Sequence, residues 1–359
     1  MLVQDKHLTT IWYEQEIDKV KIIDQRLIPF ELKIVELNTV DEVCFAIKEM
    51  QVRGAPLIGV TAAYGLYIAS KENSNLNYLK IASEKMNATR PTAVNLSWAL
   101  NKIMTNIINI KEDQLSTKIL ELANQIRQDD INNCKKIGDH GYELIKKVYE
   151  KNNRPVNILT HCNAGWLATV DWGTALAPVF VSHKNNIPVH VWVDETRPRN
   201  QGFSLTSWEL INEKIPNSLI VDNVGGHLMQ HKKIDICITG TDRTASNGDV
   251  CNKIGTYLKA LAAYDNNIPF YVSAPISSID FNIENGVRDI PIEERDSEEV
   301  SHINGMDENH QLKKIKIVPN NAKCINFAFD VTPAKYITKL ITEKGIIDPN
   351  FSSIIKLNN

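Results

Sequence analysis

Short apolar runs alternate with helix-length segments throughout the second half of the chain. The apolar runs have the length and the β-branched content of strands, and they cover residues 156–160, 187–193, 219–221, 234–239 and 269–273. The segments between them, such as 205–214 and 254–266, are long enough to be helices. Strands that alternate with helices form a parallel sheet covered on both faces. The pattern predicts a Rossmann-like, doubly wound domain, whose ligands bind beyond the carboxyl ends of the strands.

The first 150 residues have a different, mostly helical pattern. Residues 40–50 carry apolar side chains at helical spacing, and residues 58–68 are so apolar that they predict a buried helix. Residues 112–150 are dense in charge, with apolar residues mostly at helical steps, which predicts one or two amphipathic connecting helices. We therefore expect an α/β protein with a mostly helical N-terminal domain, residues 1–150, and a Rossmann-like catalytic domain, residues 151–359.

Composition excludes several classes of partner. A chain of 359 residues accommodates two domains, and its net charge of -3 gives no electrostatic reason to bind nucleic acid or an anionic membrane. The N-terminus lacks the pattern of a signal peptide, and no apolar run reaches the length of a membrane span. The six cysteines are scattered without a Cys-x-x-Cys pair, as in proteins of the reducing cytosol. We expect a cytoplasmic protein.

Motifs for the common cofactors are missing from the sequence. There is no G-x-G-x-x-G after a strand, no G-x-x-x-x-G-K-[ST] and no H-E-x-x-H. We therefore expect chemistry by ordinary side chains, with no metal and no nucleotide cofactor.

Cys162 is the first candidate catalytic residue. It follows the run 156–160 and precedes Trp166-Leu167-Ala168, which we expect to begin a helix. Free amide N–H groups and the helix dipole would then favour a thiolate. A buried, inert cysteine is the alternative. His161 points to the opposite face of the strand, so we expect it to be structural rather than the base for this thiol.

Asp242 is the second candidate. It follows the apolar run 234–239 through Gly240-Thr241, just past the carboxyl end of a predicted strand. If both strands belong to one parallel sheet, Cys162 and Asp242 face one pocket. The alternative is an aspartate that caps a helix or pairs with Arg243.

Several basic segments are candidates for binding an anion. Asn252 and Lys253 follow a polar loop, and we expect them in the opening turn of a helix, where amides and an ammonium group bind phosphate. Arginine also binds two phosphate oxygens at once. Arginines stand at bends in the segments Arg53-Gly54-Ala55-Pro56, Arg90-Pro91-Thr92 and Glu195-Thr196-Arg197-Pro198, the last of which leads to Gln201. A solvated lysine or structural ion pairs would explain the same residues.

Taken together, these segments resemble the methylthioribose-1-phosphate isomerases. That family shares its ancestry with the regulatory α, β and δ subunits of the translation factor that exchanges nucleotide on initiation factor 2. The resemblance rests above all on Thr160-His161-Cys162-Asn163-Ala164-Gly165 and Gly240-Thr241-Asp242-Arg243. It covers nearly the whole chain, through further matches at residues 24–29, 53–56, 90–96, 195–198, 201–202, 247–257, 329–333 and 342–345.

The resemblance implies a reaction and a set of site residues. The reaction is the isomerisation of 5-methylthioribose 1-phosphate to 5-methylthioribulose 1-phosphate in methionine salvage, carried out by a homodimer without a cofactor. The catalytic thiol and carboxylate of the family match Cys162 and Asp242. The substrate contacts of the family match Arg53, Gly54, Ala55, Arg90, Gln201, Asn252 and Lys253.

Such a reaction needs an acid and a hydrogen transfer. A sugar 1-phosphate has no free aldehyde, because its anomeric oxygen carries the phosphoryl group, so the ring oxygen must be protonated as the ring opens. Asp242 is the expected acid, with its pKa raised by an apolar pocket. Cys162 would remove the C2 proton as a thiolate, or would shape the pocket for a direct hydride shift.

Two other functions remain open from the sequence. The chain could be a non-catalytic regulatory or binding protein like the translation initiation factor 2B subunits. It could also isomerise 5-deoxyribose 1-phosphate or ribose 1,5-bisphosphate, which differ at C5. Gly225-Gly226 and Cys251 depart from the usual family pattern, and we expect neither to contact the catalytic pair.

Overall fold

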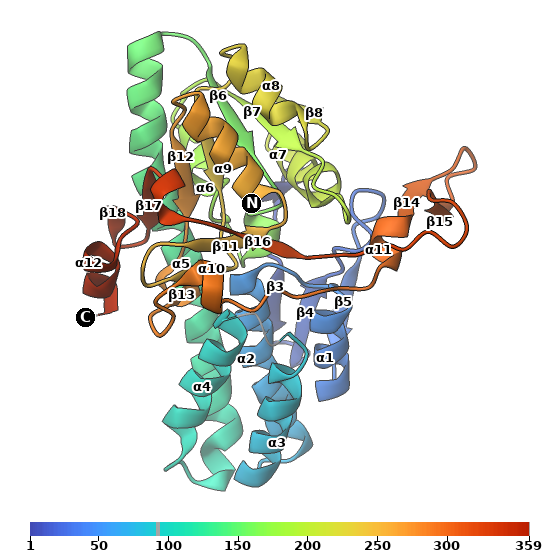
Figure 1. Ribbon diagram of the computed structural model, residues 1–359. Helices are drawn as coiled ribbons and strands as arrows, with labels where there is room; N and C mark the ends of the chain where they lie inside the picture. Colours follow the sequence, from blue (N-terminus) through green and yellow to red (C-terminus); the bar gives the residue numbers. More distant parts are fainter. Residues whose placement is uncertain (91–93, 359) are drawn as a thin grey trace.

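The computed structural model describes residues 1–90 and 94–358 (Figure 1). Pro91 and Thr92, within the second arginine loop, lie outside the described residues. The N-terminal helices lie at one end of the molecule, the main sheet lies at the other, and the long helix α5 runs beside both (Figure 1).

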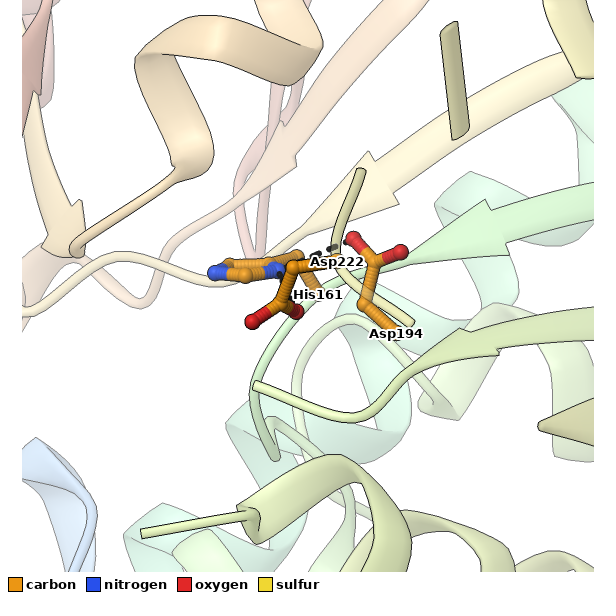
Figure 2. A group of neighbouring side chains, drawn as sticks. All are labelled: His161, Asp194 and Asp222. Carbon is orange, nitrogen blue, oxygen red and sulfur yellow. Dashed lines mark hydrogen bonds and ion pairs between the residues drawn. The ribbon is translucent and has the colours of Figure 1, made fainter. Parts of the chain in front are cut away.

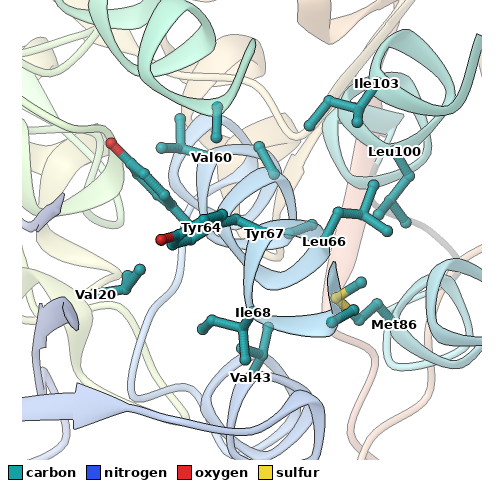
Figure 3. Packing of buried hydrophobic residues seen from close by; sticks show 14 of the residues in the cluster. Val20, Val43, Val60, Tyr64, Leu66, Tyr67, Ile68, Met86, Leu100 and Ile103 are labelled. Carbon is teal, nitrogen blue, oxygen red and sulfur yellow. The ribbon is translucent and has the colours of Figure 1, made fainter. Parts of the chain in front are cut away.

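The N-terminal part packs helices around α2. The antiparallel strands β3 (Ile11–Glu14), β4 (Lys19–Ile23) and β5 (Ile34–Leu37) precede helices α1 (Val40–Lys48), α2 (Ala55–Glu72), α3 (Leu76–Asn87) and α4 (Val94–Ile107). Helix α2 is buried along nearly its whole length, as the sequence predicts. Leu66 and Ile68 of this helix lie among Val43, Met86 and Leu100, which come from the three other helices (Figure 3). Here the fold is mostly helical, with a small sheet that the sequence did not reveal.

Helix α5 (Glu112–Asn152) joins the two parts as one continuous helix of 41 residues. Leu115 and Ile119, in its first half, belong to the same apolar core as α2. Ile137 and Ile145, in its second half, pack into the core of the main sheet. The domain boundary near residue 150 therefore stays a prediction, because one helix serves both cores.

The main sheet has seven strands in the order β18-β17-β12-β9-β6-β7-β8. Strands β6 (Val156–Thr160), β7 (Val189–Asp194), β8 (Asn217–Ile220), β9 (Ile236–Thr239), β12 (Phe270–Ser273) and β17 (Lys339–Thr342) are parallel, and β18 (Gly345–Ile347) is antiparallel at the edge. The five predicted strands are therefore confirmed. The strand order reverses between β6 and β9, and such a reversal is where ligands bind in doubly wound sheets.

Alternate residues of the strands enter two separate apolar cores. Ile158 of β6 packs with helices α5, α6 (Ala177–Lys184) and α7 (Ser207–Asn212) on one face of the sheet. Leu159, the next residue, packs with helices α8 (Val224–Gln230) and α9 (Thr256–Asp265) on the other face. This alternation, with helices on both faces, is the doubly wound arrangement that the sequence predicts.

A second sheet and a projecting arm complete the fold. Strands β13 (Ile279–Asp280), β10 (Arg243–Ala245), β11 (Val250–Lys253) and β16 (Phe329–Thr332) form a four-stranded sheet in that order. The arm, residues 290–328, ends in a hairpin of β14 (His302–Met306) and β15 (Leu312–Lys316), and it projects from the body of the molecule (Figure 1). The remaining short elements are β1 (Leu2–Val3), β2 (Lys6–His7), α10 (Gly286–Asp289), α11 (Glu298–Ser301), α12 (Phe351–Ile354), η1 (Trp166–Ala168), η2 (Gly202–Thr206), η3 (Ile276–Ser278), η4 (Ala334–Tyr336) and η5 (Ile355–Asn358).

Among the residues described, the chain has no helix that combines the length and the apolar character needed to cross a lipid bilayer.

The contact between α5 and α6 predicts an unusual response to a glycine substitution. A Cβ on Gly141 would lie 2.3 Å from Pro178 Cγ. Alanine normally stabilises a helix interior by about 1 kcal/mol over glycine. Here Gly141→Ala should destabilise the protein by about 1–3 kcal/mol, because the helices would have to separate. Urea unfolding measures this, with the exposed Glu143→Ala on the same helix as control; a more stable Gly141→Ala would contradict the tight contact.

Candidate active site

Cys162 lies beyond the carboxyl end of β6 and is 7 % exposed. Its backbone is in the left-handed region, with φ 68°. The Cys162 N–H donates to Thr196 Oγ1 at 2.8 Å, and its carbonyl accepts from Thr206 Oγ1 at 2.7 Å. The expected helix after Cys162 is wrong, because Trp166–Ala168 is only a short 3-10 turn and α6 begins at Ala177. The thiol therefore does not lie at the N-terminus of an α-helix.

The ionisation of Cys162 also differs from the expectation. Burial raises the pKa of this thiol, and the positive charges of Arg53 and Lys253 only partly oppose the rise. Asp242 raises the pKa of the thiol further as a nearby negative charge. Burial therefore favours the neutral thiol over the thiolate, and no α-helix begins directly after Cys162 to oppose this effect.

Asp242 follows β9 across the strand-order reversal from Cys162. Its N–H donates to the carbonyl of Cys251 at 2.9 Å, so Cys251 contacts the candidate pair, contrary to expectation. A small recess next to Asp242 is mostly apolar, and its other lining residues are Ala55, Ile58, Arg90, Arg243, Cys251, Ile290, Pro291 and Phe329. Burial raises the pKa of Asp242, while Lys253, Arg90 and Arg53 lower it. Arg243 forms an ion pair with Asp280 at 3.6 Å.

Lys253 is the last residue of β11, and α9 begins only at Thr256. The expectation of Asn252 and Lys253 in an opening helical turn is therefore wrong. Lys253 is 6 % exposed, and its ammonium lies 4.7 Å from the centre of the Phe329 ring. Burial lowers the pKa of Lys253, whereas the charges of Cys162 and Asp242 raise it. Asn252 donates from Nδ2 to Thr256 Oγ1 at 2.9 Å.

Arg53 links the N-terminal helices to the Cys162 loop. Its Nη1 donates to Asn163 Oδ1 at 2.5 Å, and its Nη2 donates to the Asn163 carbonyl at 2.7 Å. Gly54 has φ 93°, and a Cβ there would lie 2.4 Å from the carbonyl oxygen of Ala168, so only glycine fits. Ala55 begins α2, whose first turn has no acidic residue and no side-chain cap among the described residues. The amide N–H groups in the first turn of α2 can therefore bind an anion.

Arg90 and Gln201 have buried polar atoms that lack partners. Arg90 is 7 % exposed, and its Nε and Nη1 have no hydrogen-bond partner among the described residues. The same holds for Gln201 Oε1. Glu293 Oε2 lies 3.7 Å from Arg90 Nε. Since buried polar atoms are nearly always paired, these atoms are candidates for binding a ligand.

A cleft of about 820 Å³ adjoins these residues. Arg53, Arg90 and Gln201 line it, and Arg90 also lines the recess beside Asp242. The arm covers part of this cleft with Glu293, Arg295, His302 and Lys314. Sequence reasoning missed these four residues, because the arm shows no motif and no clear periodicity. Arg197 is structural here, since its guanidinium donates to the carbonyls of Pro198 and Val300.

His161 belongs to a cluster with Asp194 and Asp222 (Figure 2). One ligand atom from each residue lies within 4.8 Å of the others, close enough to hold a metal ion. However, the Lys259 ammonium lies 3.3 Å from Asp194 Oδ2 and already supplies a positive charge. The two ring nitrogens of His161 contact Asp194 and the carbonyl of Ile254 rather than the thiol of Cys162, which agrees with the expectation that His161 is not the base for this thiol.

Comparison with known proteins places this site in a family. Residues 51–349 match the initiation factor 2 subunit family. Proteins named methylthioribose-1-phosphate isomerase from Methylocella silvestris and Escherichia coli are 52 % and 49 % identical, each over 99 % of this chain and over 97 % and 95 % of their own lengths. The chain belongs to the methylthioribose-1-phosphate isomerase family. It is therefore an enzyme, an isomerase, which argues against the non-catalytic alternative.

Solved structures agree with this placement. The crystal structure of 5-methylthioribose 1-phosphate isomerase from Pyrococcus horikoshii has a TM-score of 0.84 and 39 % identity, over 98 % of this chain and 96 % of its own. The delta subunit of translation initiation factor eIF-2B from A. fulgidus has a TM-score of 0.79 and 36 % identity, over 98 % and 99 %. Methylthioribose-1-phosphate isomerases thus share this fold with the initiation factor subunits.

Glu209 supports the site in this isomerase and was missed from the sequence. It is fully buried on α7, and it accepts hydrogen bonds from Asn163 Nδ2 and from the N–H groups of Trp166 and Leu167, at 2.9–3.1 Å. Asn163 in turn holds Arg53. The signal that the sequence offers is a glutamate between the apolar residues Trp208 and Leu210 of the predicted helix 205–214.

The ionisation of Glu209 predicts a pH-dependent stability. Burial raises the pKa of Glu209 from 4.5 to about 7, so its stabilising contribution is full below pH 4.5 and is lost as the pH rises through 7. Glu209→Gln resembles the protonated form. The free energy of unfolding of the variant minus that of the wild type should therefore increase by a few kcal/mol, on the order given by linkage, from pH 5 to pH 8. Urea unfolding at both pH values tests this, with exposed Glu143→Gln as control; an unchanged difference for Glu209→Gln would contradict it.

Proposed function

We propose that the chain converts 5-methylthioribose 1-phosphate to 5-methylthioribulose 1-phosphate, a step of methionine salvage. The observation that carries the proposal is the burial of two acidic groups, Cys162 and Asp242, near the positive charges of Arg53 and Lys253, which act on the pKa of both. Arg90 supplies buried donors that have no partner among the described residues, and it lines both the cleft and the recess of Asp242. The names of the relatives support the same substrate.

The phosphate would be held by the cations and by a helix end. The guanidinium of Arg90 has free donors, and the uncapped start of α2 at Gly54 and Ala55 offers N–H groups. Lys253 and Arg53 add positive charge, since both act on the ionisation of Asp242. Gln201 and Asn252, both at most 5 % exposed, would bind the sugar hydroxyls.

Asp242 would protonate the ring oxygen as the ring opens. Its raised pKa keeps a proton on the carboxyl group to higher pH than an ordinary aspartate. The ring-opening activity should therefore fall as the pH rises through this pKa.

Cys162 would act in the hydrogen transfer from C2 to C1. As a thiolate it would remove the C2 proton and give an enol, which is then protonated at C1. A direct hydride shift needs only a neutral thiol that shapes the pocket, and the raised pKa of Cys162 favours this second route. Deuterium from deuterated water enters the product only in the first route.

We further propose a homodimer located in the cytoplasm. The homodimer rests on the resemblance to the family, and the location rests on six scattered cysteines without a Cys-x-x-Cys pair.

Direct assay of purified protein tests the function. We expect turnover of 5-methylthioribose 1-phosphate, with lower kcat/KM for 5-deoxyribose 1-phosphate and ribose 1,5-bisphosphate. A higher kcat/KM for one of the other two sugar phosphates would make that compound the substrate in place of 5-methylthioribose 1-phosphate. No turnover of any of the three would refute the proposal.

Removal of either candidate catalytic group should abolish most turnover. Cys162→Ser and Asp242→Asn should each lower kcat by about 100-fold or more, as expected when an acid or base is lost. Both should keep the circular dichroism of the wild type. Cys44→Ser, on α1, and the exposed Asp113→Asn are matched controls that should remain active. Near-normal kcat in Cys162→Ser or Asp242→Asn would refute the role of that residue.

Lys253→Ala should mainly raise KM. If the ammonium holds the phosphate in substrate and transition state alike, its loss weakens binding and leaves kcat almost unchanged. Lys335→Ala is a matched control, because the Lys335 ammonium also lies over an aromatic ring, 4.9 Å from the centre of Tyr336. Initial-rate kinetics measure both variants, and an unchanged KM in Lys253→Ala would exclude phosphate binding by this lysine.

A further inference from the structure

Both ring nitrogens of His161 have close oxygen partners. Nδ1 lies 2.9 Å from Asp194 Oδ2, and Nε2 lies 2.8 Å from the carbonyl oxygen of Ile254. The ring is buried, with its side chain 1 % exposed, and Figure 2 shows it beside Asp194 and Asp222. Water therefore has almost no access to either nitrogen.

These partners determine how many protons the ring carries. The Ile254 carbonyl can only accept, so Nε2 must donate to it. A carboxylate can also only accept, and the Lys259 ammonium lies 3.3 Å from Asp194 Oδ2. A neutral imidazole has one N–H group, which would leave the lone pair on Nδ1 facing an oxygen lone pair. A proton on each nitrogen satisfies both contacts.

The surrounding charges balance an imidazolium. Asp222 Oδ1 lies 3.7 Å from Nδ1, which adds a second carboxylate beside Asp194. Burial raises the pKa of Asp330 on β16, and the positive charges of His161 and Lys259 oppose that rise. Three carboxyl groups and the Lys259 ammonium thus surround the ring, so a charged ring would be compensated rather than isolated.

The hydrogen bonds of this ring connect the two halves of the site. His161 immediately precedes Cys162, and Ile254 immediately follows Lys253. On the other side, Asp222 accepts from the N–H of Thr196, whose hydroxyl accepts from the N–H of Cys162. The loops after β6, β7, β8 and β11 are therefore joined through one buried ring and its carboxylates.

We propose that His161 is an imidazolium that positions Cys162 and Lys253, by bridging Asp194 and the Ile254 carbonyl. This inference rests on the proposed function of Cys162 and Lys253. His161 contacts no substrate in this role. It is a positioning residue, and it works because a single side chain donates two hydrogen bonds in opposite directions.

The charge state can be measured without activity. In protein labelled with ¹⁵N-histidine, the two ring nitrogens of His161 should both carry protons at pH 7.5, with signals assigned by their loss in His161→Gln. A ring with one unprotonated nitrogen would overturn the proposal. The protonation of the ring is measured in the wild-type chain, so the result stands even if the variants fold poorly.

Kinetics test the positioning role. His161→Gln can still donate to Ile254, and His161→Asn can still donate to Asp194, but neither spans both partners. Per folded molecule, each should lower kcat by about 10-fold to 100-fold, as small misplacements of catalytic groups do. KM should rise less than kcat falls, because Arg53 and Arg90 still hold the phosphate.

Two controls distinguish a failure of the proposed function of Cys162 from a failure of the positioning role of His161. His190→Gln, on β7 of the same sheet, replaces a partly buried histidine that bonds Ser218 and should keep the wild-type kcat. If Cys162→Ser keeps its turnover, the proposed function of Cys162 fails. If Cys162→Ser is inactive while both His161 variants keep the kcat of His190→Gln, the positioning role of His161 is overturned and the proposed function stands.

Discussion

The parallel pairing of β6 with β9 is the constraint on which the site depends. Ile158 pairs with Ile236 and Leu159 with Cys237, and these residues are buried on both faces of the sheet. Later strands add on opposite sides of this pair, so the loops after β6 and β9 diverge and leave space between them. Cys162 and Asp242 follow these two strands, and they lie close enough for the charge of Asp242 to act on the pKa of Cys162, although they are far apart in the sequence. A register that buries both faces is strongly fixed, because a slip by one residue would reverse every side chain.

Burial then sets the electrostatics of the site. Cys162 and Asp242 have raised pKa values because they are buried, while Arg53 and Lys253 limit the rise in both. The cations are themselves incompletely paired, as the donors of Arg90 show. A phosphate at the proposed site would satisfy those donors, which would offset the cost of burying them. Buried hydrogen bonds hold the neighbouring loops in place. Glu209 bonds Asn163, next to Cys162, and His161 contacts the carbonyl of Ile254, next to Lys253.

Sequence patterns predicted the regular elements better than the loops. The strands and helices of the main sheet follow from periodicity, because burial on two faces leaves a strong apolar signal. The helix expected after Cys162 and the helical turn expected at Lys253 were wrong for a shared reason. Trp166–Ala168 and Val250–Lys253 are short segments whose conformation is set by distant partners, among them Glu209 for the first and β16 for the second. The arm, residues 290–328, likewise gave no sequence signal, because it is largely polar and covers the cleft only through tertiary contacts.

The sequence by itself determined the fold class, the family and the chemical types of the candidate residues, since apolar periodicity and ordered motifs are local properties of the chain. Only the tertiary structure decided that burial raises the pKa of Cys162, that Lys253 ends a strand and that the ring of His161 lies within hydrogen-bond distance of two loops. Ionisation and alignment depend on burial and on neighbours from remote segments, and no local pattern encodes the distance between them. The same chain can therefore be assigned to its family from short motifs, while the state of each catalytic group follows from how those motifs are packed together.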